Sequence, residues 1–184
     1  MLESEFLANR LVFLTEEITT PLATQVIKRL LLLDAQSKDD PIDLYITSPG
    51  GDVTAGLSII DAMLCLDAPV HTICLGQAAS MAAYILAAGA PGYRYATPHA
   101  EVMLHQLQLG LQGGYRDVQA RAERVAKLNE CLLKLLAGWT GQPYDQLERD
   151  CQTEHWFTAE AAREYGLLDV VMEPKRGVGH VAID

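Results

Sequence analysis

The segment that decides the fold is residues 70–88, which read VHTICLGQAASMAAYILAA. Residues 70–75 form a short apolar run with β-branched side chains and predict a buried strand. The Gly and Ala residues of 76–79 predict a tight turn, and the almost wholly apolar stretch from Ser80 to about Ala88 predicts a core helix. A strand that leads directly into a buried helix is one unit of an α/β fold.

The same alternation of strand and helix occurs on both sides of this segment. Residues 10–14 predict a strand, and Thr19 or Thr20 caps a helix that has Pro21 in its first turn. The other predicted strands are 42–47, 93–97 and 101–104, and the other predicted helices are 54–66, 115–139, one opened by Pro143, and 159–165. Together they predict an α/β fold built on crossover connections.

Length and charge narrow the class of protein. A chain of 184 residues can bury a full core, so we expect one domain over residues 1–172 and a mobile polar tail over residues 173–184. The chain has 14 Lys and Arg against 24 Asp and Glu, a net charge of −10. An acidic chain repels the phosphate backbone, so nucleic acid is not an expected partner. The more ordinary interpretation of the charge is a soluble face.

The chain start and the cysteines predict a cytoplasmic protein with no membrane partner. Residues 1–5 are acidic, whereas a secretory signal begins with a basic and then an apolar region. The most apolar stretch, residues 78–90, is shorter than the about 20 residues that cross a bilayer. Widely spaced cysteines with no C-x-x-C pair argue against a zinc site, and buried free thiols are expected instead of disulfides. The four are Cys65, Cys74, Cys131 and Cys151.

Ser80 stands where a buried strand has just delivered the chain to the first turn of a helix. Backbone N–H groups of a first helical turn have no intrahelical acceptor, so they can bind an anion. The small residues before Ser80 let a substrate backbone approach, and the Met81 N–H lies beside the carbonyl oxygen of an attacked substrate. From this segment alone, the alternative that Ser80 is an ordinary helix N-cap stays open. The G-x-S-x-G pattern of α/β-hydrolases is absent.

Two further segments carry candidate chemistry. Residues 48–51 (SPGG) end a strand, and their paired glycines can expose N–H groups as an oxyanion donor or as a rail for an extended peptide. A plain strand-to-helix turn is the alternative. His105 ends the apolar strand 102–104, a position at which α/β scaffolds place reactive side chains. The chain has 5 histidines, so only its coincidence with Ser80 favours His105 as a general base.

Taken together, the motifs resemble the ClpP family, the proteolytic subunit of the Clp protease. The matching pieces are SPGG (48–51) followed by TAG (54–56), GQAASMAA (76–83), MLHQ (103–106), TGQ (140–142), ERD (148–150) and EYGLLD (164–169). Their order is right without a gap, and the similarity spans roughly residues 7–172. The resemblance implies a ClpP/crotonase-like fold, a spiral of repeated ββα units with a projecting long handle helix.

The resemblance also implies a role for each residue of the site. Ser80 matches the nucleophile and His105 the general base, while Gly51 and Met81 match the two backbone donors of the oxyanion hole. The third triad position, an Asp in most members, falls on Glu154. Glu carries the same charge on a longer arm, so an active but slower or conditionally active triad is expected. Asp150, about one helical turn earlier, is the reserve candidate.

Other positions depart from the family pattern. The first strand starts almost at Met1, so the axial loops that precede it in family members are expected to be short or absent. Residues 152–153 replace an acidic residue and an Arg that help to lock ring to ring, and Leu107 replaces a usual Pro. Asp43 and Cys65 lie near aromatic positions that form the docking pockets for the ATPase.

The function implied by the resemblance is a serine endopeptidase that cleaves peptides and unfolded proteins inside two stacked heptamer rings, fed by a Clp-type ATPase. No metal or organic cofactor is implied. One alternative is a weak or inactive ClpP-like scaffold subunit that forms mixed rings with an active paralogue. Another is an acyl-CoA enzyme of the crotonase type, for which the sequence offers neither a convincing acid/base carboxylate nor a CoA pocket.

Overall fold

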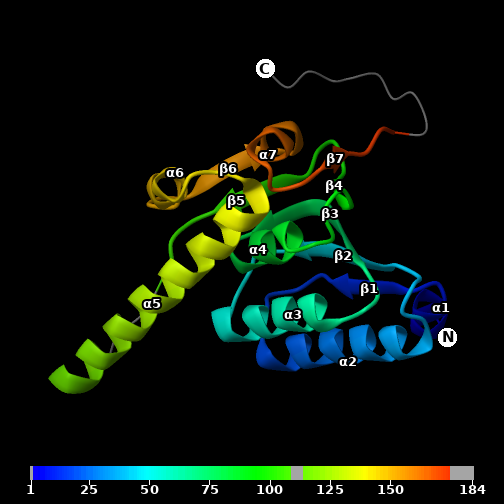
Figure 1. Cartoon of the computed structure of the whole chain (residues 1–184), viewed down its shortest axis with the longest axis horizontal. Helices are drawn as coiled ribbons and strands as arrows, with labels where there is room; N and C mark the ends of the chain where they lie inside the picture. The colour runs from blue at the N-terminus through cyan, green and yellow to red at the C-terminus, as the bar shows by residue number, and fades with distance from the viewer. Residues whose placement is uncertain (1, 109–113, 175–184) are drawn as a thin grey trace.

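The computed structural model describes residues 2–108 and 114–174, which form seven helices around a seven-stranded sheet (Figure 1). The strands are β1 (Leu11–Leu14), β2 (Ile42–Ser48), β3 (Val70–Ala79), β4 (Arg94–Ala96), β5 (Glu101–Leu104), β6 (His155–Thr158) and β7 (Val170–Val171). The helices are α1 (Leu2–Ala8), α2 (Thr20–Gln36), α3 (Val53–Cys65), α4 (Met81–Ala87), α5 (Tyr115–Thr140), α6 (Tyr144–Asp150) and α7 (Ala159–Tyr165).

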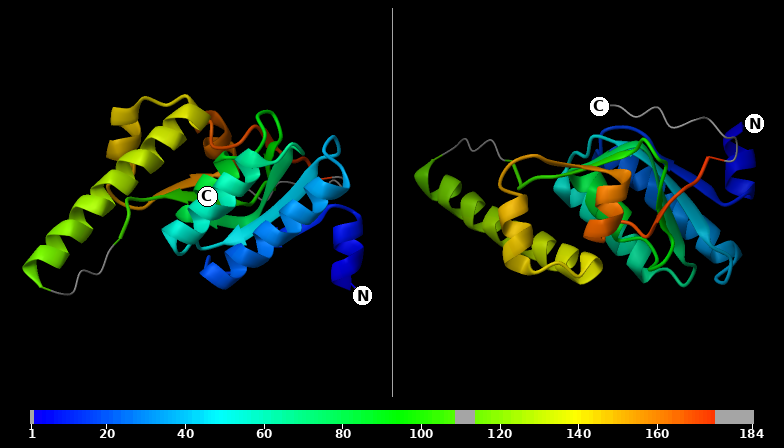
Figure 2. Two further views of the ribbon diagram at one scale, coloured as in Figure 1. Left: turned by 60° about the horizontal axis from the view of Figure 1, so that its bottom comes forward. Right: turned by 90° about the horizontal axis from the view of Figure 1, so that it is seen from above.

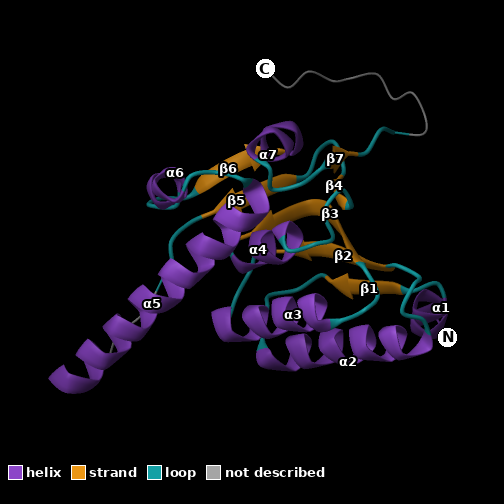
Figure 3. Cartoon of the chain, viewed as in Figure 1, coloured by secondary structure: helices purple, strands orange, loops and turns teal. Residues whose placement is uncertain are grey.

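The sheet is mixed and follows the order β1-β2-β3-β4-β7, with all of these pairs parallel. Strand β5 joins it by pairing in parallel with the end of β3, and β6 pairs antiparallel with β5. Helices α2 and α3 lie side by side along one side of the sheet, while β6, α6 and α7 lie at the opposite end (Figures 1 and 3). The α/β prediction is therefore confirmed.

The core is centred on α4, in which every residue from Met81 to Ala87 is buried. Helix α2 begins as predicted, because the side chain of Thr19 accepts a hydrogen bond from Leu22 N and Pro21 lies in the first turn. Strand β2 buries alternate side chains against the helices. The long helix α5 projects from these packed elements (Figure 2).

Strand β3 is longer than the sequence predicts, and the expected tight turn at residues 76–79 is wrong. Gly76 has φ +71°, which lets the strand bend and continue to Ala79. Before the bend, β3 pairs with β4; after it, residues 77–79 pair with residues 101–103 of β5. The glycine therefore marks the point at which one strand changes its neighbour.

The remaining differences concern short elements and cysteines. Helix α1 and strands β6 and β7 carried no periodic signal in the sequence. Cys74 and Cys151 are buried free thiols, and burial raises their pKa values to about 12 and about 11. Cys65 and Cys131 are exposed, so the expectation of burial is wrong for these two. Most of the predicted tail, residues 175–184, lies outside the described residues.

Candidate active site

Three neighbouring parallel strands end at the same edge of the sheet. Strand β2 ends at Ser48, which pairs with Ala78 of β3, and Ala79 of β3 pairs with Met103 of β5. The segments that follow carry the SPGG glycines, Ser80 and His105. The register of these strands therefore brings all three candidate segments to one edge. In open α/β sheets, ligands bind outside the carboxyl ends of parallel strands, so this edge is the expected site.

Ser80 forms a sharp turn between β3 and α4. Its backbone has φ 53° and ψ −124°, a region that non-glycine residues seldom occupy, and its N–H donates to Met103 O at 2.8 Å. A strained serine between a strand and a helix is the geometry of a nucleophile elbow, here without the usual glycine pattern. Ser80 occupies the N-cap position of α4, but its side chain makes no capping hydrogen bond. The hydroxyl is therefore not used as a cap.

The glycine segment is fitted closely against Ser80. A Cβ on Gly50 would lie 2.6 Å from Ala79 O and 2.7 Å from Ser80 Cβ, so no side chain fits there. Ser48 holds the turn, because its Oγ accepts from Gly50 N at 3.1 Å and donates to Glu16 O at 2.6 Å. The segment thus brings backbone, not side chains, to the serine.

Gly51 is held by the segment that precedes α2. It forms a parallel bridge with Ile18, in which Ile18 N donates to Gly50 O at 2.7 Å and Asp52 N donates to Ile18 O at 2.8 Å. The Gly51 N–H takes no part in this bridge. With φ +148° and a virtual Cβ only 2.4 Å from Ile18 O, the position accommodates glycine alone.

Met81 contributes the first amide of α4, and its side chain is anchored from α3. It is 2% exposed, and a Cβ on Gly56 would overlap its Cγ at 2.1 Å. Asp52 caps the start of α3 by accepting from Ala55 N at 2.7 Å. The TAG motif thus has a packing explanation that the sequence alone did not provide: it lets α3 contact the residue beside the serine.

His105 lies one residue beyond β5, and Glu154 lies one residue before β6, the strand that pairs with β5. The antiparallel register ends with Leu104 opposite His155, so the next facing positions are His105 and Glu154. His105 Nδ1 is buried and has no hydrogen-bond partner among the described residues. The exposed Glu154 carboxylate instead accepts from Trp156 Nε1 at 3.2 Å. The fold brings the two positions together, but the carboxylate is turned to the tryptophan.

The reserve carboxylate, Asp150, is engaged elsewhere. It accepts hydrogen bonds from Tyr165 Oη at 2.6 Å and from Gln146 Nε2 at 2.8 Å, and it lies 3.9 Å from His155 Nδ1. Burial acts to raise the pKa of Asp150, but the hydrogen bonds from Tyr165 and Gln146 outweigh it and lower the pKa. Asp150 therefore helps to fix α6 against α7, and in the part of the chain that the structure describes no hydrogen bond or ion pair joins it to His105.

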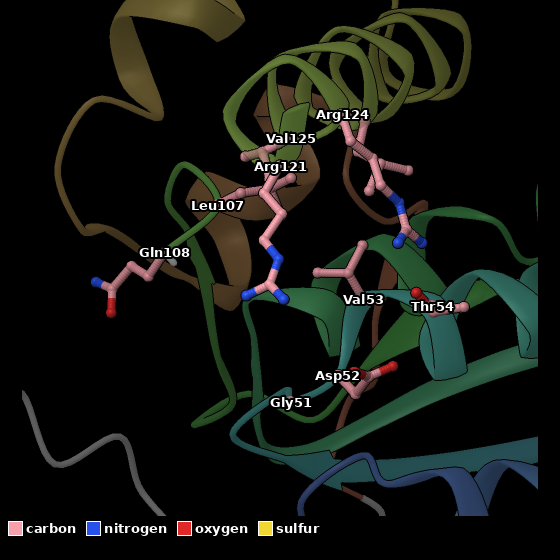
Figure 4. Close-up of a pocket in the computed structure, with 10 residues that line it drawn as sticks. Gly51, Asp52, Val53, Thr54, Leu107, Gln108, Arg121, Arg124 and Val125 are labelled. Carbon is pink, nitrogen blue, oxygen red and sulfur yellow. The ribbon is translucent and has the colours of Figure 1, made fainter. Parts of the chain in front are cut away.

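A cleft of about 530 Å³ opens beside this edge, between the first turn of α3 and the long helix α5 (Figure 4). Gly51 and Asp52 form one wall, and Leu107, just after His105, belongs to the same lining. Arg121 and Arg124 of α5 extend into the cleft. An extended peptide lying along Gly51 would therefore contact both the candidate catalytic edge and the helix.

Comparison with known proteins assigns a family. A family model described as Clp protease matches residues 2–175 of the chain. Within the described parts of the chain, no helix is both long and apolar enough to pass through a membrane. In the same residues, no group of three or more His, Cys, Asp or Glu side chains is placed to hold a metal ion.

Proposed function

This chain belongs to the Clp protease family, and from that premise we propose that it is a serine endopeptidase that cleaves peptides and unfolded proteins. Family membership implies protein substrates and an oligomeric assembly. The finer proposal is that subunits form two stacked heptamer rings whose chamber is fed by a Clp-type ATPase. Any requirement for ATP would then belong to the partner.

The proposed reaction is an acyl transfer through the serine. Ser80 Oγ attacks the scissile carbonyl carbon while His105 accepts the hydroxyl proton, and the N–H groups of Gly51 and Met81 hold the oxyanion. Collapse of this intermediate breaks the C–N bond, and His105 gives its proton to the leaving amine. Water then attacks the acyl-enzyme, again with His105 as base, and releases the new carboxylic acid.

The observation that best supports this proposal is the Ser80 turn. Ser80 is held at φ 53°, and its hydroxyl makes no capping hydrogen bond. Such a backbone conformation costs folding free energy, and residues strained in this way cluster at functional sites. Gly50 leaves the space that the turn needs. His105 follows the neighbouring strand at the same sheet edge.

The test is labelling with a fluorophosphonate, which reacts with activated serines, together with hydrolysis of a quenched fluorescent peptide by the assembled protein. We expect wild type to be labelled and active, and Ser80→Ala to lose both. Ser58→Ala is the matched control, because Ser58 is exposed on α3 and its hydroxyl donates to Ala55 O of the same helix. Peptide hydrolysis that persists in Ser80→Ala would overturn the proposal.

The second candidate function is a weak or inactive scaffold subunit in a mixed ring. It is favoured by the orphaned His105 Nδ1 and by the hydrogen bond that turns Glu154 to Trp156. A scaffold subunit would leave Ser80 unlabelled by fluorophosphonate both alone and when assembled with an active paralogue. An endopeptidase would be labelled in at least one of the two assemblies.

A further inference from the structure

The cleft between α3 and α5 contains two arginines, although the chain as a whole is acidic. Its two cations, Arg121 and Arg124, are three residues apart on α5 and therefore share a helix face. Figure 4 shows both side chains reaching from α5 toward the segment from Gly51 to Thr54. The whole chain, in contrast, carries a net charge of −10.

One carboxylate belongs to the lining, and it already has a structural partner. Asp52 caps α3 through the bond from Ala55 N at 2.7 Å. The lining therefore contains two guanidinium groups and one carboxylate. Among the described residues, no ion pair or hydrogen bond holds the guanidinium of Arg124.

The cleft also has apolar lining. Val53 of α3 and Val125 and Leu128 of α5 form this apolar wall. An aliphatic stem can pack on such a wall while a charged head reaches the arginines. Guanidinium groups bind carboxylates through paired, charge-assisted hydrogen bonds, so the chemistry of the lining matches the side chain of Glu or Asp.

We propose that this cleft is a subsite that selects an acidic side chain of the peptide substrate near the scissile bond, with Arg121 and Arg124 as the residues that set this specificity. The inference rests on the proposed peptidase function, because the cleft is placed relative to the reacting carbonyl by Gly51. The apolar wall holds the stem of the side chain, and the arginines hold its carboxylate.

The test compares capped, internally quenched peptides that differ only by Glu, Gln or Lys at positions flanking the cleaved bond. Capped ends remove terminal carboxylates, so only the side chain can supply the charge. With the assembled wild-type protein at low salt, we expect kcat/KM to be about tenfold higher for the best Glu peptide than for its Gln counterpart. The preference should weaken as salt rises, because the guanidinium groups are accessible to solvent.

Variants at the two arginines test which residue causes the preference for the Glu peptide. Arg121→Gln and Arg124→Gln should each lower the ratio of kcat/KM for the Glu peptide to kcat/KM for the Gln peptide. Arg124→Glu should shift the preference toward the Lys peptide. Arg116→Gln is the matched control, since Arg116 is exposed on the same helix but outside the cleft. A ratio near one in wild type, or a ratio unchanged in both glutamine variants, would overturn the proposal.

A binding measurement separates this inference from the proposed function. Fluorescence anisotropy with labelled peptides and the Ser80→Ala protein needs no turnover. Tighter binding of the Glu peptide than of the Gln peptide, lost in Ser80→Ala/Arg124→Gln, supports the subsite even if the wild-type protein cleaves nothing. Equal binding of both peptides contradicts the subsite even if the wild-type protein is an active peptidase.

Discussion

Ser80 adopts a backbone conformation that L-amino acids seldom occupy, and Gly50 fits closely against it. The turn brings Ser80 Cβ so near to Gly50 that an added methyl group would lie 2.7 Å from it. A side chain there would force the serine or the Met81 amide to move. The position of Ser80 is therefore set by contacts with backbone on one side and by the buried helix α4 on the other.

Gly50→Ala should abolish activity through displacement of Ser80, and Gly92→Ala separates this effect from backbone strain. Both glycines have φ near +90°, so backbone strain should cost each variant about 1 kcal/mol of stability, and the clash should cost Gly50→Ala more. A Cβ on Gly92 would meet nothing within 4 Å, whereas one on Gly50 would meet the serine. We expect kcat/KM to fall by about 10²-fold or more in Gly50→Ala only. Equal activity of the two variants would contradict the assigned fit.

Glu154 and Trp156 should affect catalysis in opposite directions. If Glu154 orients His105, Glu154→Gln should lower kcat/KM by about 10²-fold or more. Trp156→Phe removes the donor that holds Glu154 and should raise kcat/KM severalfold by freeing the carboxylate for His105. The double variant should show no such rise, which a double-mutant cycle detects. A kcat/KM in Glu154→Gln equal to that of wild type would show that Glu154 does not orient His105.

At the scale of elements, the sequence predicts those helices and strands whose ends are set by local residues. Helix α2 could be predicted because Thr19 and Pro21 mark its start, and β5 because it is a short apolar run. The end of β3 could not, because its residues are paired by a strand 24 positions away, as Gln77↔Glu101 shows. Strand β7 has only 2 residues, too few for any periodic pattern.

The site was predictable in its positions but not in its side-chain contacts. The motifs identified Ser80 and His105 as candidates, and strand register then places them at one edge. No sequence pattern indicates that Trp156 takes the Glu154 carboxylate, because rotamers depend on packing. The role of Tyr165 in holding Asp150 was missed for the same reason.

The long helix α5 is covered by its own subunit only near its end. Among the apolar side chains of this helix, Leu132 and Leu136 are buried, but Ala122 is exposed. Full burial within the subunit is therefore limited to the last third of the helix. The rest offers a surface on which a second subunit could pack.

Ala122→Glu should impair assembly, and Ala120→Glu should not. Both alanines are exposed in the single chain, but Ala120 lies on the opposite face of α5, since two residues correspond to about 200° of helix rotation. A charge buried without a partner at a subunit contact is costly. Light scattering after size-exclusion chromatography should show a smaller mass for Ala122→Glu. The same mass for both variants would mean that this face makes no subunit contact.

At the scale of the whole molecule, an ion pair between a buried arginine and a half-buried aspartate joins elements from distant parts of the chain. Arg94 is 8% exposed, and it donates to both carboxylate oxygens of Asp169 at 2.9 and 2.6 Å. Its remaining nitrogen reaches the carbonyls of Ala87, Trp139 and Gly166, at the ends of α4, α5 and α7. The negative ends of three helices thus converge on one cation.

Asp169→Asn should weaken this junction and change the response of the protein to acid. Burial acts to raise the pKa of Asp169, but the hydrogen bonds and charge of Arg94 outweigh it and lower the pKa. A carboxyl whose folded-state pKa is lowered stabilises the protein above its unfolded value of about 3.9, and this stabilisation is lost as pH falls through the folded-state pKa. Near neutral pH the variant should lose about 2–4 kcal/mol, because Arg94 is left buried without its partner.

Urea unfolding midpoints between pH 3 and pH 7 measure both effects in the assembled protein. Wild type should lose stability toward the acid end, and the difference between wild type and Asp169→Asn should shrink there, because protonated Asp169 and Asn are both uncharged. Asp67→Asn is the matched control: Asp67 pairs with Lys38 at the surface, where an ion pair contributes about 0–1 kcal/mol. A difference for Asp169→Asn as small as that for Asp67→Asn would mean that the junction of α4, α5 and α7 does not depend on this pair.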